Sequence, residues 1–191
     1  LLKHKLLIGL IYGCGLRCME VRNIKLQHLD FDRKMLHIVQ GKGKKDRYVP
    51  LSEHLIRGLK TFIKVENPDQ YLFNGNQNRN IEEIDLKTHQ NALQKPDFDS
   101  RYSQRGVQWV IKTISKKAGI TKEVHTHTLR HSYATHLLED GVPIIMVQKL
   151  LGHERIESTM EYLHVCQLSD QQPHSPLDTV FALCRKNGIP K

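Results

Sequence analysis

The segment of residues 125–165 constrains the fold most, because glycine and proline divide it into three consecutive helices. Gly141 is predicted to end the first helix, and Pro143 suits the first turn of the second. Gly152 is predicted to end that second helix. A third helix is expected from Ser158, since a hydroxyl followed three residues later by a glutamate makes a capping box. The pattern predicts a mainly helical domain here.

The first of these helices is predicted to have a buried face and a polar face. Thr126 is a candidate N-cap, and an apolar stripe recurs at i, i+4 and i+8: Leu129, Tyr133 and Leu137. Another face carries residues at i, i+3, i+4 and i+7: His127, Arg130, His131 and Ala134. Arg130 falls in the first turn, where free backbone N–H groups and the helix dipole favour an anion. This polar face is therefore a candidate anion-binding surface.

A tyrosine follows these helices on a short tether. Tyr162 lies nine residues after His153 and directly after Glu161, the predicted capping glutamate. A tyrosine between Met160 and Leu163 is, by itself, more often a core or surface residue. Its spacing from His153 is what makes it a candidate functional residue.

The histidines, the arginine and the tyrosine of these three helices follow one another in a defined order and spacing. His-x-x-Arg-His at 127–131, Leu-Gly-His at 151–153 and then Tyr162 all occur within forty residues. This series resembles the tyrosine recombinases, or phage-integrase family. The resemblance extends over roughly residues 1 to 165 and implies an α+β, mostly α-helical catalytic domain with a small antiparallel β-hairpin sheet.

A block near the start of the chain adds to the resemblance. Residues 1–13 are predicted to form an amphipathic, largely buried helix, and the turn after it resembles the family's Gly-Leu-Arg-x-x-Glu block. The resemblance implies that Arg17 contacts the scissile phosphate and that Glu20 supports the site. From spacing alone, the two would be an i, i+3 surface ion pair. Cys14 and Cys18 are a weak candidate metal pair, because no second cysteine pair follows to close a site.

Alternating apolar residues over 29–51 predict a β-hairpin around the basic turn Gly-Lys-Gly-Lys-Lys. The turn lacks the glycine spacing and the Lys-Ser/Thr end of a phosphate-binding P-loop. It resembles the family's hairpin GKGxKxRxVPL, which implies that Lys42 is the general acid for the departing 5′-oxygen. Lys44, Lys45 and Arg47 are then expected to bind the DNA backbone. Without the resemblance, all four would be assigned to a solvated basic turn.

The remaining segments define the domain organisation. Helices are predicted over 52–65 and 103–118, and the polar stretch between them is longer than expected in the family, as an inserted loop would be. Residues 166–191 are expected to form a linker and a tail helix. In the resembling family such a tail packs onto a neighbouring subunit; the local alternative folds it back on its own domain. Because the chain opens in mid-helix without methionine, an N-terminal DNA-binding domain is expected to be missing.

The charge of the chain fits a polyanionic partner. There are 29 Lys and Arg against 20 Asp and Glu, a net charge of +9, although many basic proteins bind no nucleic acid. Four cysteines in no compact framework indicate a reducing compartment, which predicts a cytoplasmic protein. No apolar run reaches membrane-spanning length, and no signal peptide is visible, so no membrane partner is expected.

The chemistry that the resemblance implies suits these residue types. A tyrosine phenol, with a pKa of about 10, can attack a phosphodiester and leave again, so a 3′-phosphotyrosyl bond stores the energy of the cut strand without ATP. Arg17 and Arg130 would hold the non-bridging oxygens. His127 and His153 would add hydrogen bonds, one of them accepting the phenolic proton, and His131 would support the site. No metal or other cofactor is needed.

The function that the resemblance implies is site-specific DNA recombination, or integration, by a homo-tetramer on double-stranded DNA sites. A phage or mobile-element origin fits this prediction. One alternative is a type IB topoisomerase with the same chemistry, and another is a DNA-binding protein that has lost catalysis. The histidine-rich first helix could suggest a metal site, but neither HExxH nor paired Cys/His spacing is present.

Overall fold

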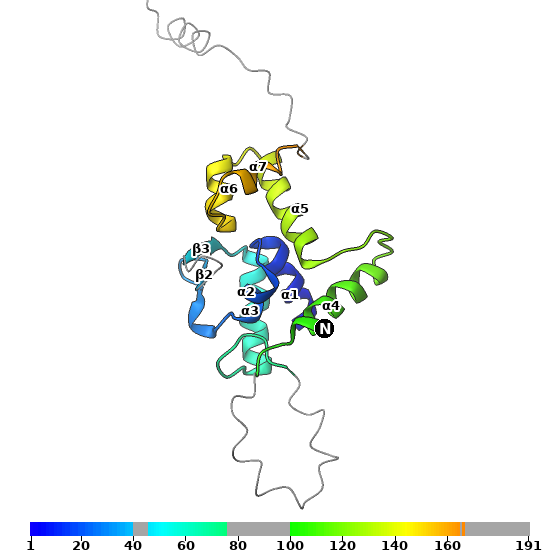
Figure 1. Ribbon diagram of the computed structural model, residues 1–191. Helices are drawn as coiled ribbons and strands as arrows, with labels where there is room; N and C mark the ends of the chain where they lie inside the picture. The colour runs from blue at the N-terminus through cyan, green and yellow to red at the C-terminus, as the bar shows by residue number, and fades with distance from the viewer. Residues whose placement is uncertain (40–45, 76–99, 165, 167–191) are drawn as a thin grey trace, which may run out of the picture.

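The computed structural model describes residues 1–39, 46–75, 100–164 and 166. The described chain is mostly helical with one small antiparallel sheet, which confirms the predicted fold class (Figure 1). Its helices are α1 Leu2–Gly13, α2 Cys18–Arg22, the 3-10 helix η1 Leu26–His28, α3 Glu53–Glu66, α4 Gln104–Lys117, α5 Thr126–Glu139, α6 Ile144–Leu151 and α7 Glu157–Met160. Its strands are β1 Leu29–Asp30, β2 Met35–Ile38 and β3 Arg47–Pro50.

Helix α1 is the central element of the main core. It packs against α2, α3, α4 and α5, and Figure 1 shows it in the middle of the molecule. Its buried residues, Leu6, Leu7, Leu10 and Ile11, recur at helical spacing, as the sequence predicted. Burial of such side chains contributes roughly 1.5–3 kcal/mol each. Because α1 is held by this packing, the position of the turn that joins it to α2 is fixed as well.

The sheet confirms the predicted strands and adds one. Strands β2 and β3 pair antiparallel with Leu36 opposite Val49, both buried, while β1 pairs with the other edge of β2. The turn that joins β2 to β3, with Lys42, Lys44 and Lys45, lies outside the described residues.

Two further predicted helices are confirmed with their caps. The Ser52 hydroxyl accepts from the Leu55 N–H at the start of α3, and the Ser103 hydroxyl accepts from the Gly106 N–H at the start of α4. Both start signals lay in the local sequence, which explains why these boundaries were predictable. The expected inserted loop falls largely in residues 76–99, outside the described residues.

Helices α5, α6 and α7 enclose a second, smaller core. Its buried members come from α5, from α6 and from the turn after α7: Tyr133, Ala134, Leu138, Val147, Leu151 and Tyr162. Residues 167–191, with the expected tail helix, lie outside the described chain. Among the described helices, none combines the length and the apolar character needed to cross a bilayer.

Two predicted helix starts in this second core are wrong. His125, not Thr126, is the N-cap of α5, and the Thr128 hydroxyl accepts from its N–H; Thr126 is the buried first residue of the helix. The predicted capping box at Ser158 is also wrong, because α7 begins one residue earlier, after Ile156. Thr126 is buried inside the helix, whereas Ser158 is exposed and lies within α7.

Gly15 joins the two cores. Its φ of +61° is in the left-handed region, and a Cβ added there would lie 2.4 Å from the Tyr133 ring on α5. Only a glycine satisfies both conditions, the backbone angle and the close approach. The turn between α1 and α2 is thereby held directly against α5.

Gly15→Ala should destabilise the protein strongly, because it adds a clash with a buried ring to the strain of a left-handed alanine. Strain of about 1–2 kcal/mol and overpacking of about 1–3 kcal/mol predict a fall in melting temperature of roughly 5–15 °C. Thermal unfolding followed by circular dichroism measures it.

Gly119→Ala is the matched control, since Gly119 has a φ of +71° with no atom within 4 Å of an added Cβ. It should show the strain alone. Equal shifts for the two variants would contradict a tight Gly15–Tyr133 contact.

Candidate active site

The start of α2 places a carboxylate beside an arginine. The Arg17 N–H donates to Glu20 Oε2 at 2.8 Å, and Arg17 Nη1 donates to Glu20 Oε1 at 2.9 Å. A carboxylate in the first turn of a helix also interacts favourably with the helix dipole. The i, i+3 pair predicted from the sequence is therefore formed, but Glu20 is buried and takes further partners.

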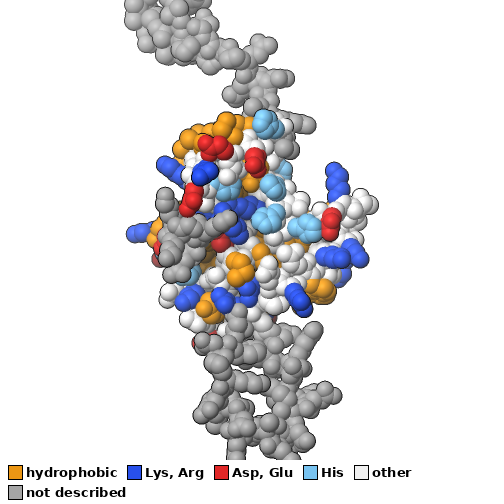
Figure 2. All heavy atoms as spheres, viewed as in Figure 1, with side chains coloured by type: hydrophobic (Ala, Val, Ile, Leu, Met, Phe, Trp, Pro, Cys, Tyr) orange, Lys and Arg blue, Asp and Glu red, His pale blue; other side chains and the backbone are white. Residues whose placement is uncertain are grey.

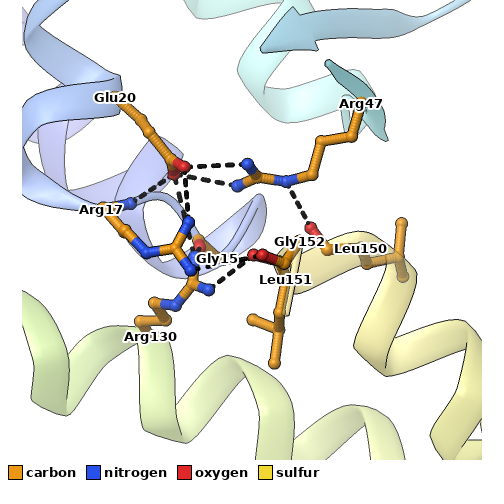
Figure 3. A network of polar contacts seen from close by, with 8 residues as sticks. All are labelled: Gly15, Arg17, Glu20, Arg47, Arg130, Leu150, Leu151 and Gly152. Carbon is orange, nitrogen blue, oxygen red and sulfur yellow. Dashed lines mark hydrogen bonds and ion pairs between the residues drawn. The ribbon is translucent and has the colours of Figure 1, made fainter. Parts of the chain in front are cut away.

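Arg47 reaches the same carboxylate from β3. Its Nη1 and Nη2 donate to Glu20 Oε1 and Oε2 at 2.8 and 2.9 Å, and its Nε donates to the Leu150 carbonyl at 2.8 Å (Figure 3). Such a bidentate pair fixes both direction and distance. Arg47 was expected to bind the DNA backbone; the structure instead buries it and commits all three of its guanidinium nitrogens to the protein.

Arg130 completes the cluster from α5. Its guanidinium donates to the Gly15 carbonyl and, at 2.6 Å, to the Leu151 carbonyl, and its Nη1 lies 3.8 Å from Glu20 Oε2. Figure 3 shows the three arginines converging on Glu20 and on the backbone between Leu150 and Gly152. Three segments far apart in the sequence therefore meet at one carboxylate, and the end of α6 is joined to them through the arginines.

The cluster carries more positive than negative charge. Burial would raise the pKa of Glu20, but hydrogen bonds and charge from Arg47 and Arg17 lower it to about 2. Burial and the charge of Arg17 lower the pKa of Arg130 to about 10, so it stays charged at neutral pH. Three guanidinium groups then share one carboxylate. The Arg17 side chain keeps 24% of its surface exposed, so the excess charge is accessible to an anion.

His153 is placed by the end of α6. Gly152 adopts φ +64°, its N–H donates to the Lys149 carbonyl, and the His153 N–H donates to the Gln148 carbonyl at 3.1 Å, which is a Schellman motif. Burial and the charges of Arg130, Arg17 and Arg47 lower the pKa of His153 to about 4. His153 is therefore neutral at physiological pH and lies near the arginine cluster.

Tyr162 lies between two imidazole rings. Its ring centroid is 5.1 Å from that of His131 and 6.2 Å from that of His153, the latter nearly parallel. Burial raises the pKa of Tyr162, while the charges of Arg130 and Arg17 act in the opposite direction. The phenol is thus protonated at neutral pH, and it is close enough to Arg130 and Arg17 for their charges to affect its pKa.

The structure brings most of the candidate residues into one region: Arg17, Glu20, Arg130, His131, His153 and Tyr162. His127 is exposed on the first turn of α5, one turn from Arg130, and has no hydrogen bond to any described residue. On the face of the molecule seen in Figure 2, Lys or Arg side chains lie near the middle with histidines beside them.

Two contributors were not predicted from the sequence: the inward orientation of Arg47, and Thr159, whose Oγ1 lies 3.0 Å from His153 Nδ1. The alternation in β3 carried a signal for the first, because Arg47 and Val49 share a face and Val49 is apolar and buried. The second depends on how α7 packs, and no local pattern marks it. Within the described ranges, no group of three or more His, Cys, Asp or Glu is arranged to hold a metal ion.

Comparison with known proteins agrees with this arrangement. The model of the phage integrase family matches residues 2–168, which is most of the chain. The chain belongs to the phage integrase family. A tyrosine recombinase of Thermosipho africanus is 40% identical over 164 residues, covering 86% of this chain and 50% of that protein. Tyrosine recombinase XerA of Pyrococcus furiosus is 34% identical over 165 residues, covering 86% of this chain and 51% of that protein.

Solved structures of this family share the fold. XerA recombinase superposes with a TM-score of 0.67 at 22% identity, covering all of this chain and 57% of that chain. XerH recombinase bound to difH in a pre-cleavage complex has a TM-score of 0.66 at 25% identity, over 85% of this chain and 42% of that one. The chain thus spans about half the length of the curated relatives it matches.

The Glu20 carboxylate should give the protein a specific acid sensitivity. Its folded pKa of about 2 lies below the ordinary 4.5, so its stabilisation is present above pH of about 4.5 and lost as the pH falls toward 2. The shift corresponds to a contribution on the order of 3 kcal/mol, of which roughly 2 kcal/mol is lost by pH 3. Urea unfolding at several pH values should show that wild type and Glu20→Gln converge in stability as the pH falls.

Glu53→Gln is the control, because Glu53 pairs with Lys34 on the surface and solvent screens that pair. Its difference from wild type should change little with pH. A Glu20→Gln difference that is equally flat would show that folding does not lower the pKa of Glu20.

Proposed function

We propose that this chain is the catalytic part of a site-specific DNA recombinase. It cuts and rejoins a DNA strand through a covalent 3′-phosphotyrosyl intermediate, without metal or ATP. The observation that carries the proposal is the position of Tyr162, between His131 and His153 and within reach of the charges of Arg130 and Arg17. A nucleophile beside a net-positive cluster suits attack on a phosphodiester.

The arginines supply the electrostatic part of the reaction. The transition state of phosphoryl transfer gathers negative charge on the non-bridging oxygens, and fixed guanidinium groups stabilise that charge without reorganising. The partly exposed Arg17 contacts the phosphate directly, and Arg130 lies behind it, held by two backbone carbonyls. Glu20 and Arg47 keep both arginines in place.

Proton transfer needs an acceptor and a donor. Burial raises the pKa of Tyr162, so the phenol must lose its proton as it attacks. His127 and His131 on α5 are the proposed candidates for this base, since the low pKa of His153 makes it a weak one. Lys42, which lies outside the described residues, is proposed as the acid that protonates the departing 5′-oxygen, on the strength of its motif.

Double-stranded DNA recombination sites are the proposed partner. The relatives are named recombinases, and both XerH with difH and the Tn1549 transposon integrase are in complex with DNA. The net charge of +9 supports such a partner. Lys44 and Lys45 are proposed to contact its backbone, and four copies are proposed to assemble on two sites.

Tyr162→Phe should abolish covalent attachment to DNA while leaving the fold intact, because it removes one hydroxyl and keeps the ring. A nicked suicide substrate, which traps the intermediate, should give a protein–DNA adduct on a denaturing gel with wild type and none with the variant. An adduct that persists would rule out Tyr162 as the nucleophile.

Tyr71→Phe is the matched control, since Lys25 and Arg101 lie over its ring and Tyr71 is not one of the candidate site residues. It should form the adduct normally.

Lys42→Ala should slow adduct formation without removing it, which separates an acid from a nucleophile. Absence of any adduct with wild type on a bound recombination site would favour a DNA-binding protein that has lost catalysis.

A further inference from the structure

The side chain of Thr159 contacts the imidazole ring of His153. It lies in α7, its residue is fully buried, and its Oγ1 is 3.0 Å from His153 Nδ1. This is the only hydrogen bond of the Thr159 hydroxyl to any part of the chain that the structure describes. Thr159 also precedes Tyr162 by one turn, and its carbonyl accepts from the Tyr162 N–H at 3.1 Å. One residue is therefore bonded to both the histidine and the tyrosine.

The contact can be formed in two directions, and they are not equivalent. If Thr159 Oγ1 donates to Nδ1, the hydroxyl hydrogen and the nitrogen lone pair are both satisfied. If Nδ1–H donates to Oγ1, the hydroxyl hydrogen is left buried without an acceptor among the described residues, which costs free energy. Hydrogen accounting at this buried site therefore favours the hydroxyl as donor.

The direction of this bond decides which nitrogen of His153 carries the proton. A neutral imidazole has one N–H, so an Nδ1 that accepts from Thr159 leaves the proton on Nε2. His153 is neutral at physiological pH, so it does not hold a proton on both nitrogens. Its backbone is fixed as well, because the Gln148 carbonyl accepts from its N–H and Gln148 Nε2 donates to its carbonyl at 3.2 Å. The backbone that carries the ring is thus held in place, and the contact with Thr159 fixes which edge of the ring faces α7.

We propose that Thr159 is a positioning residue that holds His153 in its Nε2–H form, so that His153 donates a hydrogen bond to the reacting phosphate and does not accept the proton of Tyr162. The assignment deepens the proposed function and rests on it for the identity of the ligand. The tautomer itself is a property of the free protein and does not depend on that function.

Nitrogen NMR of the free protein tests the tautomer directly. Protein labelled with ¹⁵N-histidine should show a His153 Nδ1 signal of an unprotonated, hydrogen-bonded nitrogen and an Nε2 signal of a protonated one; comparison with His153→Gln assigns the pair. Thr159→Ser should keep this pattern, and Thr159→Val should move it toward a mixture of both forms. A wild-type His153 protonated on Nδ1 would overturn the proposal, whether or not the protein cuts DNA.

The rate of adduct formation tests the consequence. Thr159→Val should slow single-turnover cleavage of a suicide substrate by about tenfold or more, the scale on which losing the group that orients a functional histidine acts, with DNA affinity unchanged. Thr159→Ser should restore the rate, because it returns the hydroxyl without the methyl. Ser158→Ala, a hydroxyl removed from the neighbouring exposed position, should have no effect.

Two outcomes would contradict the role in catalysis. A Thr159→Val rate equal to wild type would mean that the hydroxyl does not matter, and a Thr159→Ser rate as low as that of Thr159→Val would mean that the methyl group acts through packing. If wild type forms no adduct at all, the proposed function fails, while the NMR result still decides the tautomer.

Discussion

The carboxylate of Glu20 is the interaction on which the site depends. Both of its oxygens accept from the Arg47 guanidinium and from Arg17, whose backbone N–H binds one and whose side chain binds the other, and it lies 3.8 Å from Arg130. Each arginine comes from a different element, so this one charge ties the α1–α2 turn, β3 and α5 together. Arg47 and Arg130 extend the connection to α6 through the Leu150 and Leu151 carbonyls. The end of α6 in turn sets the position of His153.

This arrangement is costly for stability and useful for binding an anion. Buried ion pairs gain little net free energy, because desolvation offsets much of the Coulomb attraction. Here burial and, after it, repulsion from the neighbouring guanidinium groups lower the pKa values of Arg130 and His153. A phosphate would relieve that repulsion. The arginine cluster is thus arranged to bind an anion before any anion is present.

Local signals in the sequence predicted much of this site, and tertiary packing decided the rest. The pair of Arg17 and Glu20 followed from i, i+3 spacing, and the turn before His153 followed from Gly152, since both features are determined within a few residues. The contact of Arg47 with Glu20 joins residues 27 positions apart, so it depends on the tertiary structure that brings β3 to α2. The alternation of β3 did indicate that the Arg47 side chain lies on the same inward face as Val49. The capping box predicted at Ser158 failed because α7 begins at Glu157, so Ser158 lies inside the helix and does not precede it.

A double-mutant cycle between Glu20 and Arg47 tests the central claim most directly. Unfolding free energies would be measured for wild type, Glu20→Gln, Arg47→Met and the double variant at pH 7. If the carboxylate holds β3 to α2 through this pair, the two changes should couple by about 2–3 kcal/mol, whereas Lys34→Met with Glu53→Gln should couple far less. Additivity of Glu20→Gln and Arg47→Met to within about 0.5 kcal/mol would contradict the account.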